Sequence, residues 1–265
     1  MQFFVLILWL FLLPSTVLSA AFGEREWLAD HTVRCPTGPS NISSEVETLA
    51  WEGGCKDGFA EGPGTLTFFL HGRINAKAVG EWHQGKQQGR GIASKATGDR
   101  YDGEFRDGVA EGKGKLFRAD GDRYEGEFRT GKRNGLGRYI FSGGATYEGE
   151  FVEDEQSGRG RYTADDGSIY VGEWKSGRKN GSGTLTNPAG DTYTGSFRDG
   201  NFYGWGTLAW ASGGHYEGPF VDARAEGIGR FFYPDGKTYV GIWVNGCARD
   251  GSRVLAIGVD RRSCP

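Results

Sequence analysis

YEGEFRTGKRNGLGRYIFSGGAT, residues 124–146, is one period of a pattern that recurs every 23 residues along the chain. Each period opens with an aromatic residue, followed by a glycine two positions later and a second aromatic residue two positions after that. These triplets are Tyr101/Gly103/Phe105, Tyr124/Gly126/Phe128, Tyr147/Gly149/Phe151, Tyr170/Gly172/Trp174, Tyr193/Gly195/Phe197, Tyr216/Gly218/Phe220 and Tyr239/Gly241/Trp243. A fixed period of this length predicts a linear array in which each repeat packs mainly on its two neighbours.

Less regular copies extend the array at both ends. Upstream, Ala78/Gly80/Trp82 lies in phase, and Trp51/Gly53/Cys55 is displaced by four extra residues. Each complete repeat also carries a second glycine pair, such as Gly112 and Gly114. After Trp243 this pair is replaced by Asp250 and Ser252, which indicates a terminal half repeat. We therefore expect nine repeats, from Trp51 to about Gly246.

Each repeat is expected to form a β-hairpin. Because side chains alternate along a strand, Tyr124 and Phe128 share one face while Glu125 and Glu127 share the other, so one face is apolar and the other acidic. A polar stretch, residues 129–134, suits a hairpin loop of about five residues. Glycine-containing turns fall before each tyrosine and link one hairpin to the next. Glycine on the apolar face leaves room for aromatic rings to pack.

The predicted fold class is therefore all-β, an elongated ribbon of tandem hairpins with no helix. Two strands per repeat, at a spacing of about 4.8 Å, would make nine repeats about 85 Å long. An isolated hairpin is marginally stable in water, so stability must come from stacking of the aromatic faces.

The consensus is Tyr-x-Gly-Glu-Phe/Trp followed by a glycine pair and a glycine turn, and it closely resembles the MORN repeat (membrane occupation and recognition nexus). Residues 170–183 show the pattern almost complete. The resemblance implies a twisted β-ribbon used for scaffolding, protein binding or dimerisation, with phospholipid binding proposed for some members. Ala78 and Cys55 depart from the pattern by replacing aromatic residues.

The chain begins with an apolar run, residues 3–13, followed by Pro14 and small residues. This pattern predicts a secretory signal peptide, residues 1–21, cleaved near Ala20 or Ala21; the alternative is an uncleaved anchor. The remaining divisions are an N-terminal cap segment (22–50), the repeat array (51–246) and a C-terminal cap segment (247–265). We therefore expect a secreted protein or one in the lumen of the secretory pathway.

The four cysteines lie at the edges of the array, and none lies between residues 78 and 240. Three pairings are formally open. Bonded cysteines need Cα atoms within about 7 Å, and a ribbon of the expected length holds its ends much further apart. The sequence therefore predicts Cys35 with Cys55 and Cys247 with Cys264, each bond serving to hold a cap.

Two sequons, Asn41-Ile42-Ser43 and Asn180-Gly181-Ser182, are candidate glycosylation sites. The first falls in a segment before the array and the second in a repeat loop. Chance sequons are common, so an unmodified asparagine is the alternative at each position.

The sequence favours a non-enzymatic protein without a cofactor or bound metal. The four histidines share no spacing, and the recurring glutamates fall once per repeat, as structural positions do. Asp120-Gly121-Asp122 resembles part of a calcium loop, but it is a turn that lacks the remaining ligands. A net charge of −3 argues against nucleic acid as a partner.

Two groups of residues are candidate binding surfaces. An aromatic group in one repeat, Phe202, Tyr203, Trp205 and Trp210, is a candidate contact for protein or sugar; packing within the array is the alternative. A basic group in the hairpin loops, Lys132, Arg133, Arg178 and Lys179, is a candidate site for anionic lipid; ordinary solvated turns are the alternative.

The preferred hypothesis is a scaffold that binds another protein or a second copy of itself. A carbohydrate or cell-wall binding module that uses the aromatic group is the second hypothesis. A peripheral phospholipid binder that uses the basic group is the third.

Overall fold

The computed structural model describes residues 33–35 and 47–265, and these residues fall into two units. The N-terminal unit contains the described residues up to 155, and the C-terminal unit contains residues 156–265. Both units consist of antiparallel β-strands, and the described residues contain no α-helix. Within this part of the chain no helix is long and apolar enough to cross a membrane. The predicted all-β array of hairpins is confirmed.

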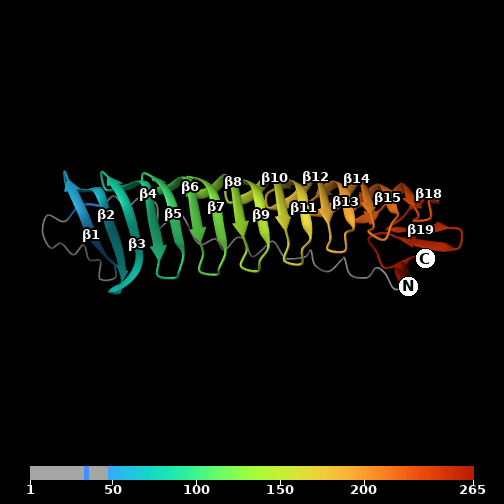
Figure 1. Ribbon diagram of the computed structural model, residues 1–265, viewed down its shortest axis with the longest axis horizontal. Coiled ribbons are helices and arrows are strands. Elements are labelled where there is room, and N and C mark those ends of the chain that lie inside the picture. The colour runs from blue at the N-terminus through green and yellow to red at the C-terminus, as the bar shows by residue number, and fades with distance from the viewer. Residues whose placement is uncertain (1–32, 36–46) are drawn as a thin grey trace. The chain divides into compact units, whose positions relative to one another are not determined.

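Nine strands form the N-terminal unit, and each pairs antiparallel with the next along the chain (Figure 1). They are β1 (Glu47–Lys56), β2 (Phe59–Leu70), β3 (Arg73–His83), β4 (Lys86–Lys95), β5 (Arg100–Arg106), β6 (Val109–Phe117), β7 (Arg123–Arg129), β8 (Lys132–Ile140) and β9 (Thr146–Val152).

The C-terminal unit repeats this arrangement and ends in a small separate sheet. Its main strands are β10 (Glu155–Thr163), β11 (Ile169–Lys175), β12 (Arg178–Thr186), β13 (Thr192–Arg198), β14 (Asn201–Ala209), β15 (His215–Val221), β16 (Arg224–Ala225), β17 (Gly227–Phe232) and β18 (Thr238–Trp243). The short β16 and β17 both pair with β15. A last hairpin, β19 (Cys247–Asp250) and β20 (Arg253–Ala256), precedes a 3₁₀ turn, η1 (Arg261–Ser263).

The hairpin loops are shorter than the sequence predicted. Between β7 and β8 only Thr130 and Gly131 lie outside the strands, and both have positive φ, 50° and 79°, as a two-residue type I′ turn requires. The prediction of a loop of about five residues within 129–134 is wrong, because Arg129 belongs to β7 and residues 132–134 belong to β8. A bulge opposite Glu127 absorbs the extra residues, and Gly135 enters it with φ 88°.

The connecting turns lie where the glycine pattern predicted them. Gly121, with φ 98°, donates its N–H to the Arg118 carbonyl at 3.0 Å. The Arg118 N–H donates in turn to the Asp122 carbonyl at 2.9 Å. Equivalent bonds close the turns at Gly144, Gly167, Gly190, Gly213 and Gly236.

Stacked tyrosines form the inner face of both units. The Tyr124 ring covers Gly126 on its own strand and Gly137 on the next, and a Cβ at either glycine would lie 2.4 Å from ring or hydroxyl atoms. Its hydroxyl donates to the Glu127 carbonyl at 3.0 Å. The six equivalent tyrosines from Tyr101 to Tyr216 are at most 2% exposed. The predicted packing role of these glycines is confirmed.

Edge-to-face contacts extend this packing from one repeat to the next. The Tyr124 centroid lies 5.1 Å from Phe128 of its own repeat and 5.1 Å from Phe151 of the following repeat. In the C-terminal unit Tyr170 makes the same two contacts with Trp174 and Phe197, at 5.3 and 4.9 Å. Such ring pairs contribute about 0.5–1.5 kcal/mol beyond the area that they bury.

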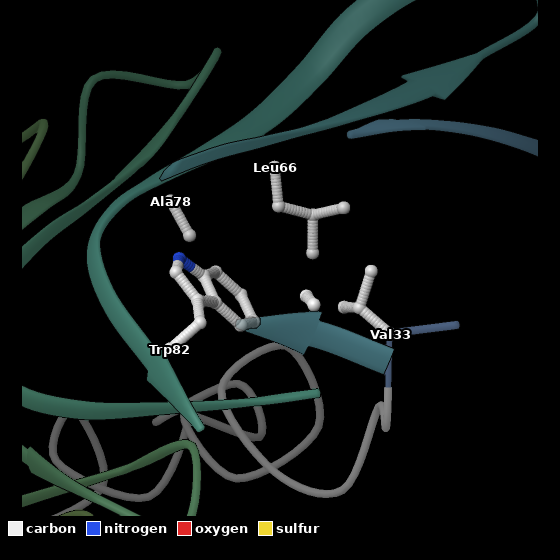
Figure 2. Packing of buried hydrophobic residues seen from close by; sticks show 5 residues of the cluster. Val33, Leu66, Ala78 and Trp82 are labelled. Carbon is white, nitrogen blue, oxygen red and sulfur yellow. The ribbon is translucent and has the colours of Figure 1, made fainter. Parts of the chain in front are cut away.

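A short segment closes the first hairpins of the N-terminal unit. The Val33 N–H donates to the Gly85 carbonyl at 2.8 Å, and the Val33 carbonyl accepts from Ala60 at 3.0 Å. A third bond, from Gly85 N–H to the Ala60 carbonyl at 2.9 Å, completes the ring of three. Figure 2 shows the Val33 side chain beside Leu66 and Trp82, in the buried cluster that closes this end.

The last hairpins of the C-terminal unit are closed by the same three bonds. The Ile257 N–H donates to the Gly246 carbonyl at 2.8 Å, the Ile257 carbonyl accepts from Ala225 at 3.5 Å, and the Gly246 N–H donates to the Ala225 carbonyl at 2.9 Å. Ile257 is 2% exposed, as deeply buried as its counterpart Val33. We call each three-bond arrangement an end clasp.

Each end clasp is accompanied by a disulfide. Cys35 is bonded to Cys55, with Cα atoms 6.1 Å apart, and Cys247 to Cys264, with Cα atoms 5.6 Å apart. Both predicted pairings are confirmed. The predicted signal peptide and most of the 22–50 segment lie outside the described residues.

Candidate functional site

One row of outer-face positions runs through every repeat, and we call it the outer row. In the N-terminal unit the row consists of the directly paired residues Pro63–Glu81, Arg90–Glu104, Lys113–Glu127 and Leu136–Glu150. Neighbouring outer positions carry ion pairs, such as Lys115–Glu125 at 3.0 Å and Arg138–Glu148 at 2.9 Å. This outer face is therefore mixed in charge, and the expectation of an acidic face is corrected by the cations on the returning strands.

The outer row changes character within the C-terminal unit. Its pairs are Arg159–Glu173, Ser182–Ser196, Trp205–Pro219 and Ile228–Ile242. Serine, proline and isoleucine thus replace the glutamate of the five preceding repeats. The facing position, which carries a cation in three of those repeats, becomes serine, tryptophan and isoleucine. The backbone pairing is unchanged, so the substitution alters only what the surface presents.

The result is an exposed apolar patch over β14, β15, β17 and β18. Its large members are exposed as follows: Trp205 64%, Val221 45%, Ile228 68%, Val240 60%, Ile242 68% and Val244 54%. Pro219 lies between Trp205 and the isoleucines, and we include it in the apolar patch. Large exposed apolar side chains gathered on one face in this way are typical of an interaction site.

The structure divides the predicted aromatic group between two faces. Phe202 stacks on Tyr193 at 3.7 Å and meets Phe220 edge-on at 5.8 Å, so it belongs to the inner packing. Trp210 lies at a connecting turn and packs on Phe231 at 5.4 Å. Tyr203 and Trp205 lie on the outer face, where the Arg198 guanidinium covers the Tyr203 ring at 3.4 Å. Of the four, Trp205 presents the largest open surface.

The two predicted lipid-binding residues of the N-terminal unit are engaged within it. Arg133 is half-buried, with its guanidinium 5.0 Å from the Tyr139 centroid, and forms an ion pair with Asp154 at 3.1 Å. Lys132 donates to the Glu153 carboxylate. These ion pairs neutralise both charges within the array.

In the C-terminal unit the two predicted lipid-binding residues differ in exposure. Arg178 is half exposed and lies 3.8 Å from Asp199. Lys179 is 8% exposed and sits 5.2 Å from the Tyr170 centroid. Burial lowers the pKa of the Lys179 ammonium to about 8, although Asp166 opposes this shift. Lys179 is therefore part of the inner packing.

Groups that resemble catalytic or metal-binding residues have structural partners. The Asp122 carboxylate accepts from the Ser142 N–H and the Tyr139 hydroxyl and so ties one connecting turn to the next. His83 pairs with Glu61 at 3.0 Å, and His215 lies 3.5 Å from Glu217. Among residues 33–35 and 47–265 no cluster of three or more potential metal ligands occurs.

The two predicted glycosylation sites differ in what the structure says of them. Asn180 lies in β12, beside the bulge glycine Gly181, and is half-buried. Asn41 lies outside the described residues.

Family comparison agrees with this architecture. The model of the MORN repeat matches residues 51–69, 79–100, 101–123, 124–146, 147–169, 170–192 and 216–238, which is more than half of the chain. The chain belongs to the MORN-repeat family. The MORN repeat at residues 193–215 is not matched, yet β13 and β14 there form the same bulged hairpin.

Comparisons with individual proteins add little. No curated protein matches the chain. Among solved structures, selenomethionine-substituted virginiamycin B lyase from Staphylococcus aureus is 12% identical, covering 80% of this chain and 96% of its own, with a TM-score of 0.16.

Reasoning from the sequence missed most of the apolar patch. The signal was present in a single column of the repeat: Glu81, Glu104, Glu127, Glu150 and Glu173 are followed by Ser196, Pro219 and Ile242. The aromatic group drew attention to Trp205 but not to Ile242. Ile228 lies outside this column, and only strand register places it beside Ile242.

Proposed function

We propose that this MORN-repeat protein is a non-enzymatic scaffold of the secretory pathway that binds protein through the apolar patch. The observation that carries the proposal is the change in the outer row, where pairs that each contain a glutamate in five repeats give way to Trp205–Pro219 and Ile228–Ile242. Tryptophan is one of the residue types enriched in binding hot spots, and Trp205 is exposed beside Pro219. The inner face is filled by the protein's own tyrosines, which favours the outer face as the surface for a partner.

Two further observations support the non-enzymatic and secretory parts of the proposal. The strongest pKa shifts belong to tyrosines such as Tyr124, whose pKa is raised by burial and whose hydroxyl is used in packing. Two disulfides at the ends of the array suit an oxidising compartment, as does the apolar leader at residues 3–13.

The test is affinity capture with the mature chain, residues 22–265, expressed with both disulfides formed. Wild type, Trp205→Ser and the matched control Lys113→Ser, which changes the same row position in the N-terminal unit, are immobilised and exposed to secretory-compartment extract. We expect defined proteins to bind wild type and Lys113→Ser, and their retention to fall at least tenfold on Trp205→Ser. Each retained protein is then purified and its affinity measured directly.

Binding assays on variants of the same kind also test the other two hypotheses, a carbohydrate module and a lipid binder. Retention of no protein, or equal retention by all three chains, would overturn the proposal. Trp205-dependent binding to a glycan array would instead favour the carbohydrate module. Salt-sensitive flotation with anionic liposomes, lost in Arg178→Gln, would favour the lipid binder.

A further inference from the structure

The geometry points to a second copy of this chain as an occupant of the apolar patch, packed face to face about a two-fold axis. This inference rests on the proposed function and names one partner for the same surface. Three features carry it: the order of residues along the outer row, the charges beside it and the size of the patch.

The outer row is arranged so that it can meet itself. Its four apolar members follow one another across the sheet as Trp205, Pro219, Ile228 and Ile242. A two-fold axis parallel to the strands, placed between β15 and β17, sets Trp205 over Ile242 of the second copy. The same operation sets Pro219 over Ile228 of the second copy. Large side chains thus meet across the interface, and no charge of this row is buried.

The next row of outer positions is complementary in charge under the same operation. Glu217 on β15 is paired directly with Arg230 on β17, one residue of each sign. The axis places Glu217 over Arg230 of the second copy, and Arg230 over Glu217. A two-fold interface must be self-complementary because the same surface is used twice. This row satisfies the requirement with two ion pairs between opposite charges.

The patch is large enough for a modest dimer. With its tryptophan and isoleucines about two-thirds exposed, it presents on the order of 600 Å² of apolar surface, the upper end for a monomer. Two such surfaces packed as aligned sheets would bury about 1,200 Å², where specific interfaces begin. We therefore expect a reversible dimer with a dissociation constant in the micromolar range.

The decisive experiment is sedimentation equilibrium on the mature chain over a wide concentration range. Wild type should be a monomer–dimer system. The double variant Ile228→Arg/Ile242→Glu should raise the dimer dissociation constant at least tenfold. This variant gives positions 228 and 242 the residue types of the Arg159–Glu173 pair, which occupies the equivalent positions in an earlier repeat. An unchanged circular dichroism spectrum and melting temperature will show that the variant is folded.

Matched controls separate this surface from others. Val171→Lys changes an exposed outer valine that occupies the position of Val240 in an earlier repeat, and it should leave the dimer intact. Arg230→Glu should weaken the dimer by placing like charges opposite each other. Adding Glu217→Arg to that variant should restore most of the affinity.

The results also separate this inference from the proposed function. A wild-type chain that stays monomeric overturns the inference, and the capture experiment then decides alone whether another protein is bound. A dimer that tolerates Ile228→Arg/Ile242→Glu overturns it as well, and so does an open-ended polymer. Trp205-dependent flotation with anionic vesicles by a monomeric chain would assign the patch to a membrane instead.

Discussion

The hairpins around Lys113 and Glu127 and those around Ile228 and Ile242 share one backbone plan and present opposite surfaces. In both regions a tyrosine covers two facing glycines, and the outer residues are paired in the same register. Only the outer side chains differ, charged in the first region and apolar in the second. The comparison shows that the inner face specifies the hairpin, which leaves the outer face free to change.

The largest effect should come from the shared inner face. Tyr147→Ala in the N-terminal unit and Tyr216→Ala in the C-terminal unit each remove a side chain that is 0% exposed. Both should cost about 3–5 kcal/mol, because each leaves a cavity beside the facing glycines. Urea unfolding of the two variants measures this. A much smaller loss in either region would show that the inner faces are not equivalent.

The next largest loss of stability should come from removing the disulfides at the two ends of the array. Replacing Cys35 and Cys55 by serine should cost about 3 kcal/mol, and replacing Cys247 and Cys264 should cost about the same, since the bonded cysteines are 20 and 17 residues apart. Thermal unfolding with and without reductant measures both. Reductant should destabilise wild type and each pair variant but not the chain that lacks all four cysteines.

The cations at the equivalent positions 133 and 179 should have opposite effects on the free energy of unfolding. Arg133 is paired with Asp154, whereas burial lowers the pKa of Lys179, at the same position, to about 8. The unfolded chain keeps the Lys179 proton up to about pH 10, so stability should rise between pH 8 and 10. Lys179→Gln should add about 2 kcal/mol at pH 7 and flatten this rise.

Arg133→Gln is the counterpart, and it should destabilise by about 2 kcal/mol because Asp154 loses its partner. Urea unfolding as a function of pH measures both changes. The prediction of opposite effects is contradicted if Lys179→Gln also lowers the free energy of unfolding at pH 7.

The smallest effect on stability should come from the outer face. Lys115→Ala removes an exposed ion pair, and Trp205→Ala removes an exposed ring; each should change the free energy of unfolding by about 0.5 kcal/mol or less. Only Trp205→Ala should weaken binding of a partner or of a second copy; Lys115→Ala should leave binding unchanged. A loss above about 1 kcal/mol for Trp205→Ala would mean that the patch serves the fold.

The sequence predicted what depends on the repeat itself. The tyrosines, their glycine slots, the connecting turns and both disulfides follow from a strict 23-residue period and alternation along a strand. The tight turn at Thr130 and Gly131 did not follow, because a bulge hides three strand residues in an apparent loop. Strand parity breaks at such a bulge and cannot be read by counting.

The candidate site was harder to predict because exposure depends on neighbouring strands. Phe202 and Trp205 are three residues apart, yet one stacks on Tyr193 and the other faces solvent. Lys179 looked like a loop cation and is buried. Each of these outcomes is set by the bulge at Gly204 or Gly181, where φ is positive and the chain changes face.

The end clasps bear on how such a chain can grow. Val33 and Ile257 occupy the same backbone setting, formed by an alanine of one repeat and the turn glycine of the next. Neither clasp uses a feature that depends on how many hairpins separate the two ends. Duplication or loss of one 23-residue segment in the interior would leave both clasps intact, so the number of hairpins can evolve independently of the contacts that close the two ends.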